Sequence, residues 1–218
     1  MITIILIILT TLISIRAFKD NDLMSRIIFH PPAVKHGEWH RLFTYGVAHA
    51  DYTHLIFNMF TLYFFGPEIE SVFKSILGQT TGSIFYILLY LSALIVSIIP
   101  SYFKNKDNAS YYSLGASGAV SAIIFAYVLI NPMNYMGVLF IPVMLPAFLF
   151  GLIFILISMS LEKKQSGVIN HSAHIAGGIY GIIYMIAIFF IVADINLLSS
   201  FIDQIKVESI TDLFYFGF

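Results

Sequence analysis

The sequence predicts an all-α polytopic membrane protein, a bundle of six transmembrane helices. Apolar residues make up 59% of the 218 positions and charged residues only 11%, whereas charged residues are about 25% of a typical soluble domain. The mean hydropathy is +0.88, and the apolar residues fall into long runs. A soluble domain of this length could not bury so much apolar surface. We therefore expect the lipid bilayer to surround most of the chain.

Composition also excludes several classes of function. The formal net charge is -1, so the chain has no excess of basic residues to neutralise phosphates, and nucleic acid is not an expected partner. The chain contains no cysteine. Disulfides, thiolate metal ligands and a cysteine nucleophile are therefore excluded.

Six apolar segments are candidate spans, and in chain order they are 1–15, 49–65, 82–103, 117–130, 136–161 and 173–193. The first has no basic residue before it and no Ala-x-Ala site after it, so we interpret it as a retained span and not as a signal peptide. Residues 18–45 hold much of the charge and are expected at the membrane surface. We expect one domain over residues 1–193 and a short tail, 194–218, to which no role is assigned.

The fourth and fifth segments have unusual features for membrane helices. The fourth is shorter than the about 20 residues that cross a bilayer. If its helix begins at Ser117, that end is recessed below one membrane surface, and residues 111–115 must be irregular backbone that is buried in protein or faces water. The fifth contains Pro142 and Pro146, which predict a kinked and mobile helix.

Ser117 is the candidate nucleophile. Gly115 and Gly118 lie close to it on either side and permit a tight turn and the close approach of a substrate backbone. A serine needs a base to take its proton, and the free N–H groups at the start of a helix suit an anionic tetrahedral intermediate. The alternative is that these small residues only form a packing surface between membrane helices.

His174 is the candidate base, because histidine most often takes this role. Gly177 and Gly181 follow it at three and seven residues and share its helix face. A row of small residues also follows Ser117: Gly118, Ala122 and Ala126. Two such faces can pack with their backbones close. If loops alternate sides, the fourth and sixth spans run parallel and Ser117 lies at the depth of His174. The alternative is an interfacial histidine without a chemical role.

His54 and Asn58 are candidates for an oxyanion hole. They are four residues apart and share one helix face, from which each can donate a hydrogen bond toward a common point. The alternative is a pair of hydrogen bonds between helices, and we expect a structural role for His49, which lies off this face. His171 and His174 could form half of a metal site, but no acidic residue lies in that segment, so no metal is expected.

A serine and a histidine inside membrane segments suggest a protease that cuts within the bilayer. Other ways of cutting a peptide bond there fit this sequence less well. A metalloprotease would need a His-Glu-x-x-His helix, and the sequence has no His-Glu dipeptide. An aspartyl mechanism would need two carboxylates at membrane depth, and Asp51 has no mate within another span. Serine chemistry is what remains for such a reaction.

Taken together, these motifs resemble the rhomboid family of intramembrane serine proteases. The three main matches are Gly115-Ala116-Ser117-Gly118, Ala173-His174-Ile175-Ala176-Gly177 with Gly181, and His49-x4-His54-x3-Asn58. Two further segments look like family motifs, namely Glu38-Trp39-His40-Arg41-Leu42-Phe43-Thr44 and Gly66-x3-Glu70. The resemblance covers roughly residues 37–181 in the family's order. It departs at His40, where an aromatic or apolar residue is common.

The resemblance implies a Ser117–His174 dyad, with His54 and Asn58 at the oxyanion, no cofactor, and single-pass transmembrane proteins as substrates. It also implies four structural residues near the site: Gly115, Gly118, Gly177 and Gly181. The alternative is a catalytically inactive rhomboid-like protein that binds membrane helices for quality control, although the presence of both dyad residues favours the enzyme. A small transporter would need charged sites at mid-bilayer or an internal repeat, and neither is evident. The oligomeric state is left open.

Two signals for membrane orientation disagree. The connections on the side of Ser117 hold most of the basic residues: Arg16, Lys19, Arg26, Lys35, Arg41, Lys104, Lys106, Lys163 and Lys164. Lys74 and Lys206 lie on the other side, so the positive-inside rule predicts a cytoplasmic active-site face. Resemblance to bacterial rhomboids implies a bacterial plasma membrane with that face outside. We follow the resemblance, because several of these charges lie in one long surface loop.

Overall fold

The computed structural model describes residues 1–137, 141–164 and 170–216, and this part of the chain is mostly helical. Its α-helices are α1 (Ile2–Ala17), α2 (Asn21–Ile27), α3 (Pro31–Lys35), α4 (Arg41–Thr44), α5 (Tyr52–Leu77), α6 (Gln79–Asn105), α7 (Ser117–Ile130), α8 (Ala147–Lys164), α9 (His171–Ala193) and α10 (Leu197–Gln204). The other elements are two 3-10 turns, η1 (Tyr45–Val47) and η2 (Ile210–Leu213), and an antiparallel hairpin of β1 (Tyr135–Gly137) with β2 (Met144–Pro146). The mainly helical fold is confirmed, and the small hairpin is the exception.

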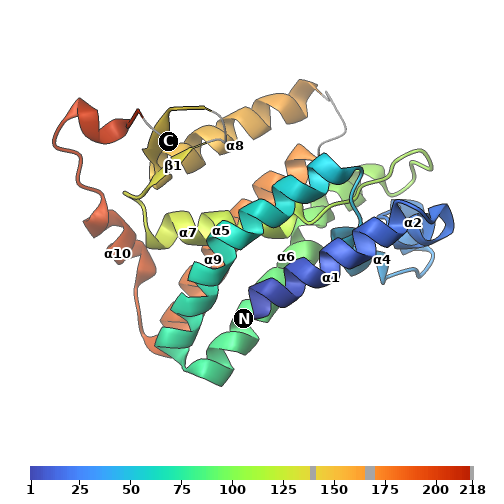
Figure 1. The fold of residues 1–218 in the computed structure, drawn as a ribbon, viewed down its shortest axis with the longest axis horizontal. Helices are drawn as coiled ribbons and strands as arrows, with labels where there is room; N and C mark the ends of the chain where they lie inside the picture. Colours follow the sequence, from blue (N-terminus) through green and yellow to red (C-terminus); the bar gives the residue numbers. More distant parts are fainter. Residues whose placement is uncertain (138–140, 165–169, 217–218) are drawn as a thin grey trace.

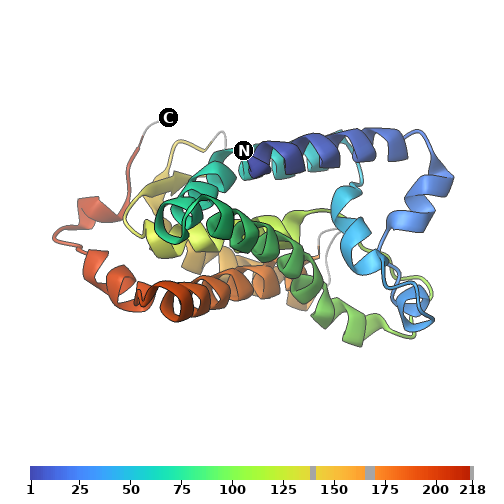
Figure 2. The same ribbon diagram turned by 90° about the horizontal axis from the view of Figure 1, so that it is seen from below.

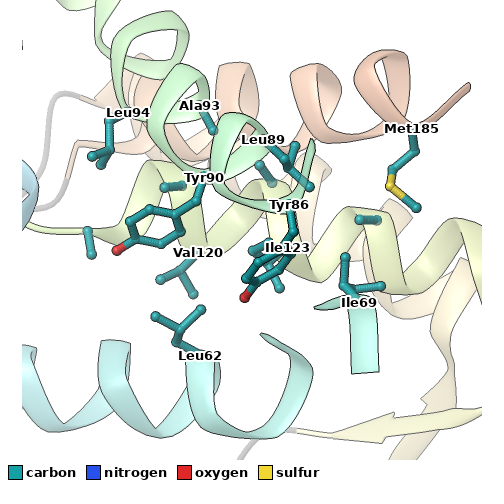
Figure 3. Packing of buried hydrophobic residues seen from close by; sticks show 14 of the residues in the cluster. Leu62, Ile69, Tyr86, Leu89, Tyr90, Ala93, Leu94, Val120, Ile123 and Met185 are labelled. Carbon is teal, nitrogen blue, oxygen red and sulfur yellow. The ribbon is translucent and has the colours of Figure 1, made fainter. Parts of the chain in front are cut away.

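Helix α7 lies at the centre of the bundle. It packs against α5, α6 and α9, and its contact with α9 is the most extensive between any two helices of the described chain. Ten of its 14 residues are buried, as expected for a helix that is apolar on every face. Val120 and Ile123 of α7 point toward Leu62 of α5 and Tyr86 of α6 (Figure 3). The helix that begins at the candidate nucleophile is therefore fixed by neighbours on several sides.

Six helices correspond to the six predicted spans. The bounds of α7 are those predicted, those of α1, α6 and α9 are close to the prediction, and α5 continues to Leu77, well beyond residue 65. Only α6 and α9, among the described residues, are both long and apolar enough to cross a membrane, whereas α1, α7 and most of α8 are shorter apolar helices. The number of spans therefore stays a prediction.

The prediction for the fifth segment is wrong in its first half. Residues 135–137 and 144–146 pair as the hairpin, and α8 begins only at Ala147. Pro142 lies outside any helix, Pro146 ends β2, and the sequence of α8 contains no proline. Proline lacks the N–H that a helix interior needs, but it is tolerated at the end of an edge strand. The predicted proline kink is therefore absent from α8.

The two ends of the bundle carry different connecting segments. Helices α2, α3 and α4 lie at one end, on the right in Figures 1 and 2, whereas the hairpin and α10 lie toward the left. The irregular chain that leads into α7 is joined to the α2–α4 end, because Phe29 and Ser113 exchange two backbone hydrogen bonds of 2.9 and 3.0 Å. Residues 111–115 contain no helix, as predicted. The start of α7 therefore faces the α2–α4 end.

Helix α1 is held against α5 through the segment that looks like a Gly-x3-Glu motif. The buried carboxylate of Glu70 accepts hydrogen bonds from the backbone N–H groups of Ile2 and Thr3, both at 2.9 Å, and pairs with Lys74. A side chain on Gly66 would collide with Thr3, since its Cβ would stand 2.5 Å from the threonine methyl group. These contacts fix the first helix to the bundle at the end remote from Ser117.

The tail after residue 193 folds back on the bundle. Leu197 at the start of α10 is buried, and α10 packs against α7 and α9. Farther along, Tyr215 exchanges two backbone hydrogen bonds of 2.8 Å with Met144 of β2. The tail is thus attached to the hairpin that precedes α8. The division of the chain into a domain and a tail stays a prediction.

Candidate active site

Ser117 is the first residue of α7, and the backbone before it is fixed by two hydrogen bonds. The N–H of Gly115 donates to the Tyr45 carbonyl at 2.9 Å, and the N–H of Ala116 donates to His49 Nε2 at 3.4 Å. His49 is fully buried. Its contact with the Ala116 backbone helps to hold the turn that presents Ser117.

The imidazole of His54 lies against this same turn. A Cβ on Gly115 would stand only 2.6 Å from His54 Cε1, and Gly115 has φ +116°. Glycine is therefore required here both by the backbone conformation and by the neighbouring ring. His54 is fixed in the first turn of α5, where Asp51 caps the helix by accepting from its N–H at 2.7 Å. The structure thus brings His54 to the chain that leads into Ser117.

Helices α7 and α9 meet along a seam of backbone contacts. A Cβ on Gly177 would stand 2.1 Å from the Gly118 carbonyl oxygen, and one on Gly181 would stand 2.3 Å from the Ala122 carbonyl oxygen. Contact partners thus advance by four residues in the same direction on both helices, so α7 and α9 run parallel. Near the start of the seam, a Cβ on Gly118 would stand 3.5 Å from the Ala173 carbonyl oxygen.

This register places Ser117 and His174 at neighbouring helix starts, since each is adjacent in the chain to a residue of the seam. Both are half-buried. Among the residues that the structure describes, no hydrogen bond joins the Ser117 hydroxyl to the His174 ring. Catalytic hydrogen bonds are often long in the absence of substrate and shorten when it binds. The structure therefore brings the two residues together without placing them in direct hydrogen-bond contact.

An aromatic ring on α8 covers the imidazole of His174. The Phe154 ring is stacked on it, with 6.0 Å between ring centroids and 30° between ring planes. The Phe154 ring also contacts the ring of Phe125 on α7, with 5.9 Å between ring centroids. A stacked ring restricts rotation of the imidazole, so packing supplies part of the orientation that a carboxylate gives in a triad.

Asn58 is buried on α5 and has a partner on its own helix. Its Nδ2 donates to the His54 carbonyl oxygen at 3.0 Å. An amide nitrogen carries two hydrogens, so one donor is left for another acceptor. Asn58 thus follows His54 on the same helix face, as predicted, and its first hydrogen bond is to its own helix rather than to another one.

The start of α9 is fixed by Asn170. Its Oδ1 accepts from the N–H of Ala173 at 3.1 Å and so caps the helix, while its Nδ2 donates to Tyr111 and Ser113 at 3.2 and 3.1 Å. Ser101 of α6 also lies within hydrogen-bond distance of this amide. One side chain therefore connects the helix that carries His174 to the irregular chain that leads into Ser117.

His171 also lies beside His174. It is buried, and its ring is nearly perpendicular to that of His174, with 5.9 Å between centroids and 84° between planes. Within the described part of the chain, no carboxylate or third histidine joins the pair in a cluster that could hold a metal ion.

Sequence reasoning missed two residues of this site. Asn170 had a local signal, because an asparagine just before an apolar helix is a favoured N-cap residue. Phe154 had none, since it is one of several aromatic residues in α8 and only the packing of α8 on α9 places it on His174.

The arrangement gathers a hydroxyl at a helix start, an imidazole at the start of the neighbouring helix, and further hydrogen-bond donors from α5. A family model for the rhomboid domain matches residues 36–191, which include all of these parts. The chain belongs to the rhomboid family.

Three curated rhomboid relatives show how far the similarity extends. The chain is 30% identical over 170 residues to "RHOMBOID-like protein 12, mitochondrial" of Arabidopsis thaliana, a match that covers 74% of this chain and 50% of the relative. It is 32% identical over 94 residues to "Putative rhomboid protease YdcA" of Bacillus subtilis (strain 168), covering 43% and 42%. It is 30% identical over 142 residues to "Presenilin-associated rhomboid-like protein, mitochondrial" of Homo sapiens, covering 63% and 35%.

These matches span half or less of each relative's length. The family model, which matches most of this chain, is what identifies it as a membrane protein of the rhomboid family. Because the relatives come from both a bacterium and mitochondria, the similarity does not assign this rhomboid to a bacterial plasma membrane.

Proposed function

We propose that this rhomboid is an intramembrane serine endopeptidase that cleaves transmembrane segments of other membrane proteins. The observation that carries the proposal is the parallel register of α7 and α9, whose backbones touch at Gly118 and Gly177. This register gives Ser117 and His174 neighbouring positions at two helix starts. The family assignment and the printed name of the Bacillus subtilis relative, "Putative rhomboid protease YdcA", add support.

In the proposed reaction, Ser117 Oγ attacks the carbonyl carbon of the scissile bond while His174 takes its proton. His174 then passes this proton to the leaving amine, which leaves an acyl group on Ser117. The oxyanion receives hydrogen bonds from the N–H groups at the start of α7, from His54 and from the second amide hydrogen of Asn58. The proposal needs neither a metal nor a cofactor.

The proposed substrates are single-pass transmembrane proteins. Peptide bonds in a membrane helix are hydrogen-bonded within the helix and shielded by side chains. A substrate therefore has to unwind locally, at small or helix-breaking residues, before its carbonyl can reach Ser117. The half-buried position of Ser117 and His174 suits a short unwound segment better than an intact helix.

The reaction can be tested with purified protein in detergent and a generic transmembrane substrate. We expect the wild type to cleave the substrate. The control variant Ser75→Ala, which changes an exposed serine on α5, should cleave it as well. Ser117→Ala and His174→Ala should each lose detectable cleavage, because the two residues act as a unit. Cleavage by a folded Ser117→Ala protein would exclude the serine mechanism. A folded wild type that binds transmembrane segments without cutting them would instead support the inactive rhomboid-like function.

We further propose a plasma membrane location with the active-site face toward the exterior. The chain contains no cysteine, so a single introduced cysteine is the one thiol that a maleimide can label. Its labelling shows on which side of the membrane that residue lies. Ser110, in the irregular segment before α7, and Ser75, near the end of α5, are both exposed. A membrane-impermeant maleimide added to intact cells should label Ser110→Cys and not Ser75→Cys. The reverse pattern would place the active-site face in the cytoplasm, as the positive-inside rule predicts.

A further inference from the structure

His171 is a buried histidine for which the proposed dyad has no use. It is the first residue of α9 and only 7% of its surface is exposed. Its Nδ1 atom is buried and has no hydrogen-bond partner among the residues that the structure describes. Buried polar atoms without a protein partner are normally satisfied by an ordered water molecule.

The two imidazoles are too far apart to be joined by a direct hydrogen bond. A direct hydrogen bond between two ring nitrogens, at about 2.9 Å, would bring the ring centroids to about 5 Å. The centroids of His171 and His174 are 5.9 Å apart, with the rings nearly perpendicular. The separation is too long for a direct bond and is compatible with one bridging water molecule.

A water molecule beside His171 would lie where the second step of the proposed reaction needs one. Hydrolysis of an acyl enzyme needs a water beside the general base and near the acylated serine. His174 is the proposed base, and the Gly118–Gly177 contact brings the starts of α7 and α9 together. A water beside His171 is therefore next to the base, in a place that is buried rather than open to bulk solvent.

We propose that His171 positions the water that hydrolyses the acyl enzyme. The inference rests on the proposed function and adds a residue to it. The water oxygen bonds to the acyl carbon while His174 takes one water proton. The bond between that carbon and Ser117 Oγ then breaks, and His174 returns the proton to Oγ. His171 holds the water by a hydrogen bond at Nδ1 and neither gains nor loses a proton, so it is a positioning residue.

The rate of Ser117 labelling and the rate of substrate turnover together distinguish a water-positioning role of His171 from a packing role. A fluorophosphonate labels the Ser117 hydroxyl with the help of His174 and without water as a reactant, whereas cleavage of a transmembrane substrate needs both steps. We expect His171→Phe, which keeps a flat ring but has no nitrogen, to label within about twofold of wild type, while substrate turnover falls by about 10- to 100-fold. Acyl enzyme should accumulate in this variant. Hydroxylamine, which attacks the acyl carbon in place of the positioned water, should restore release of the fragment.

Matched variants control for the fold. His171→Gln keeps a polar group that can bind water and should recover part of the turnover. Phe154→Leu removes the ring stacked on His174 and should lower labelling and turnover together. Melting temperature is measured for every variant, and His171→Gln remains the test if His171→Phe does not fold.

The outcomes distinguish the two proposals. Parallel loss of labelling and turnover in both His171 variants would show that His171 only packs against His174, and unchanged turnover would show that it holds no reacting water. Either result overturns the role of His171 but leaves the proposed protease function intact. A folded wild type that neither reacts with fluorophosphonate nor cleaves would overturn the proposed function itself.

Discussion

Gly177 of α9 lies directly against Gly118 of α7, so closely that a methyl group on Gly177 would stand 2.1 Å from the Gly118 carbonyl oxygen. One turn farther, Gly181 lies against the backbone of Ala122 in the same way. Van der Waals packing between small residues is a principal source of attraction between membrane helices. Here it also sets the distance between the chain segments that carry the proposed nucleophile and the proposed base.

The seam predicts a steep loss of activity when Gly181 is enlarged. A Cβ at this position would stand 2.3 Å from the Ala122 carbonyl oxygen, and backbone cannot move aside as a flexible side chain can. Gly181→Ala should separate the helices, and Gly181→Leu should separate them further. About 1 Å of misplacement at a reacting pair costs on the order of 100-fold in rate. Substrate cleavage and thermal melting of the purified variants measure the two effects.

Gly151 on α8 provides the matched control for this seam. A Cβ there would stand 3.3 Å from a ring atom of Phe125, a side chain that can shift slightly. Gly151→Ala should therefore keep most of its activity and stability. If Gly181→Leu cleaved and melted like wild type, α7 and α9 would not meet along this face, and the placement of Ser117 beside His174 would be wrong.

Asn58 tests the proposed oxyanion hole. Asn58→Ala should lower the turnover rate by about 10- to 1000-fold with little change in KM, because a donor to the oxyanion acts mainly in the transition state. Asn131→Ala is the control: this asparagine donates to Glu68 at 2.7 Å in an exposed contact after the end of α7, and its loss should leave turnover unchanged. A rise in KM at constant kcat, or no effect at all, would return Asn58 to a purely structural role on α5.

The features that were predicted correctly depend on local chemistry. The bounds of α7 follow from the turn before Ser117 and from Asn131 and Pro132, which end the helix and can be recognised in the sequence. The irregular segment 111–115 follows from the shortness of that helix. The small-residue faces of α7 and α9 are likewise visible as a spacing of glycines and alanines.

The features that were missed depend on contacts between distant segments. Helix α8 begins at Ala147 and not near residue 136, because β2 pairs with β1 and also with Tyr215 of the tail. The stacking of Phe154 on His174 arises only when α8 packs on α9. The bond from Asn58 to the His54 carbonyl shows a third limit, since an amide on a helix can turn to its own backbone as readily as to a neighbour.

Two different kinds of contact thus position His174. The seam with α7 fixes the helix axis, and the contacts at the start of α9 fix where that helix begins relative to the chain before Ser117. Asn170 contributes to the second kind in two ways, because it is a helix cap and a connector at once.

Asn170→Ala should therefore lower both stability and activity. Loss of an N-cap side chain alone costs about 1 kcal/mol, and the variant also loses the donors to Tyr111 and Ser113. Asn196→Ala removes the same cap chemistry from α10, where Asn196 accepts from the N–H of Ser199 at 3.0 Å, and should lower melting without lowering turnover. Asn170→Asp keeps the acceptor for Ala173 and removes the amide donors, so it should regain melting temperature while turnover stays low. Equal recovery of both quantities would show that Asn170 acts only as a cap.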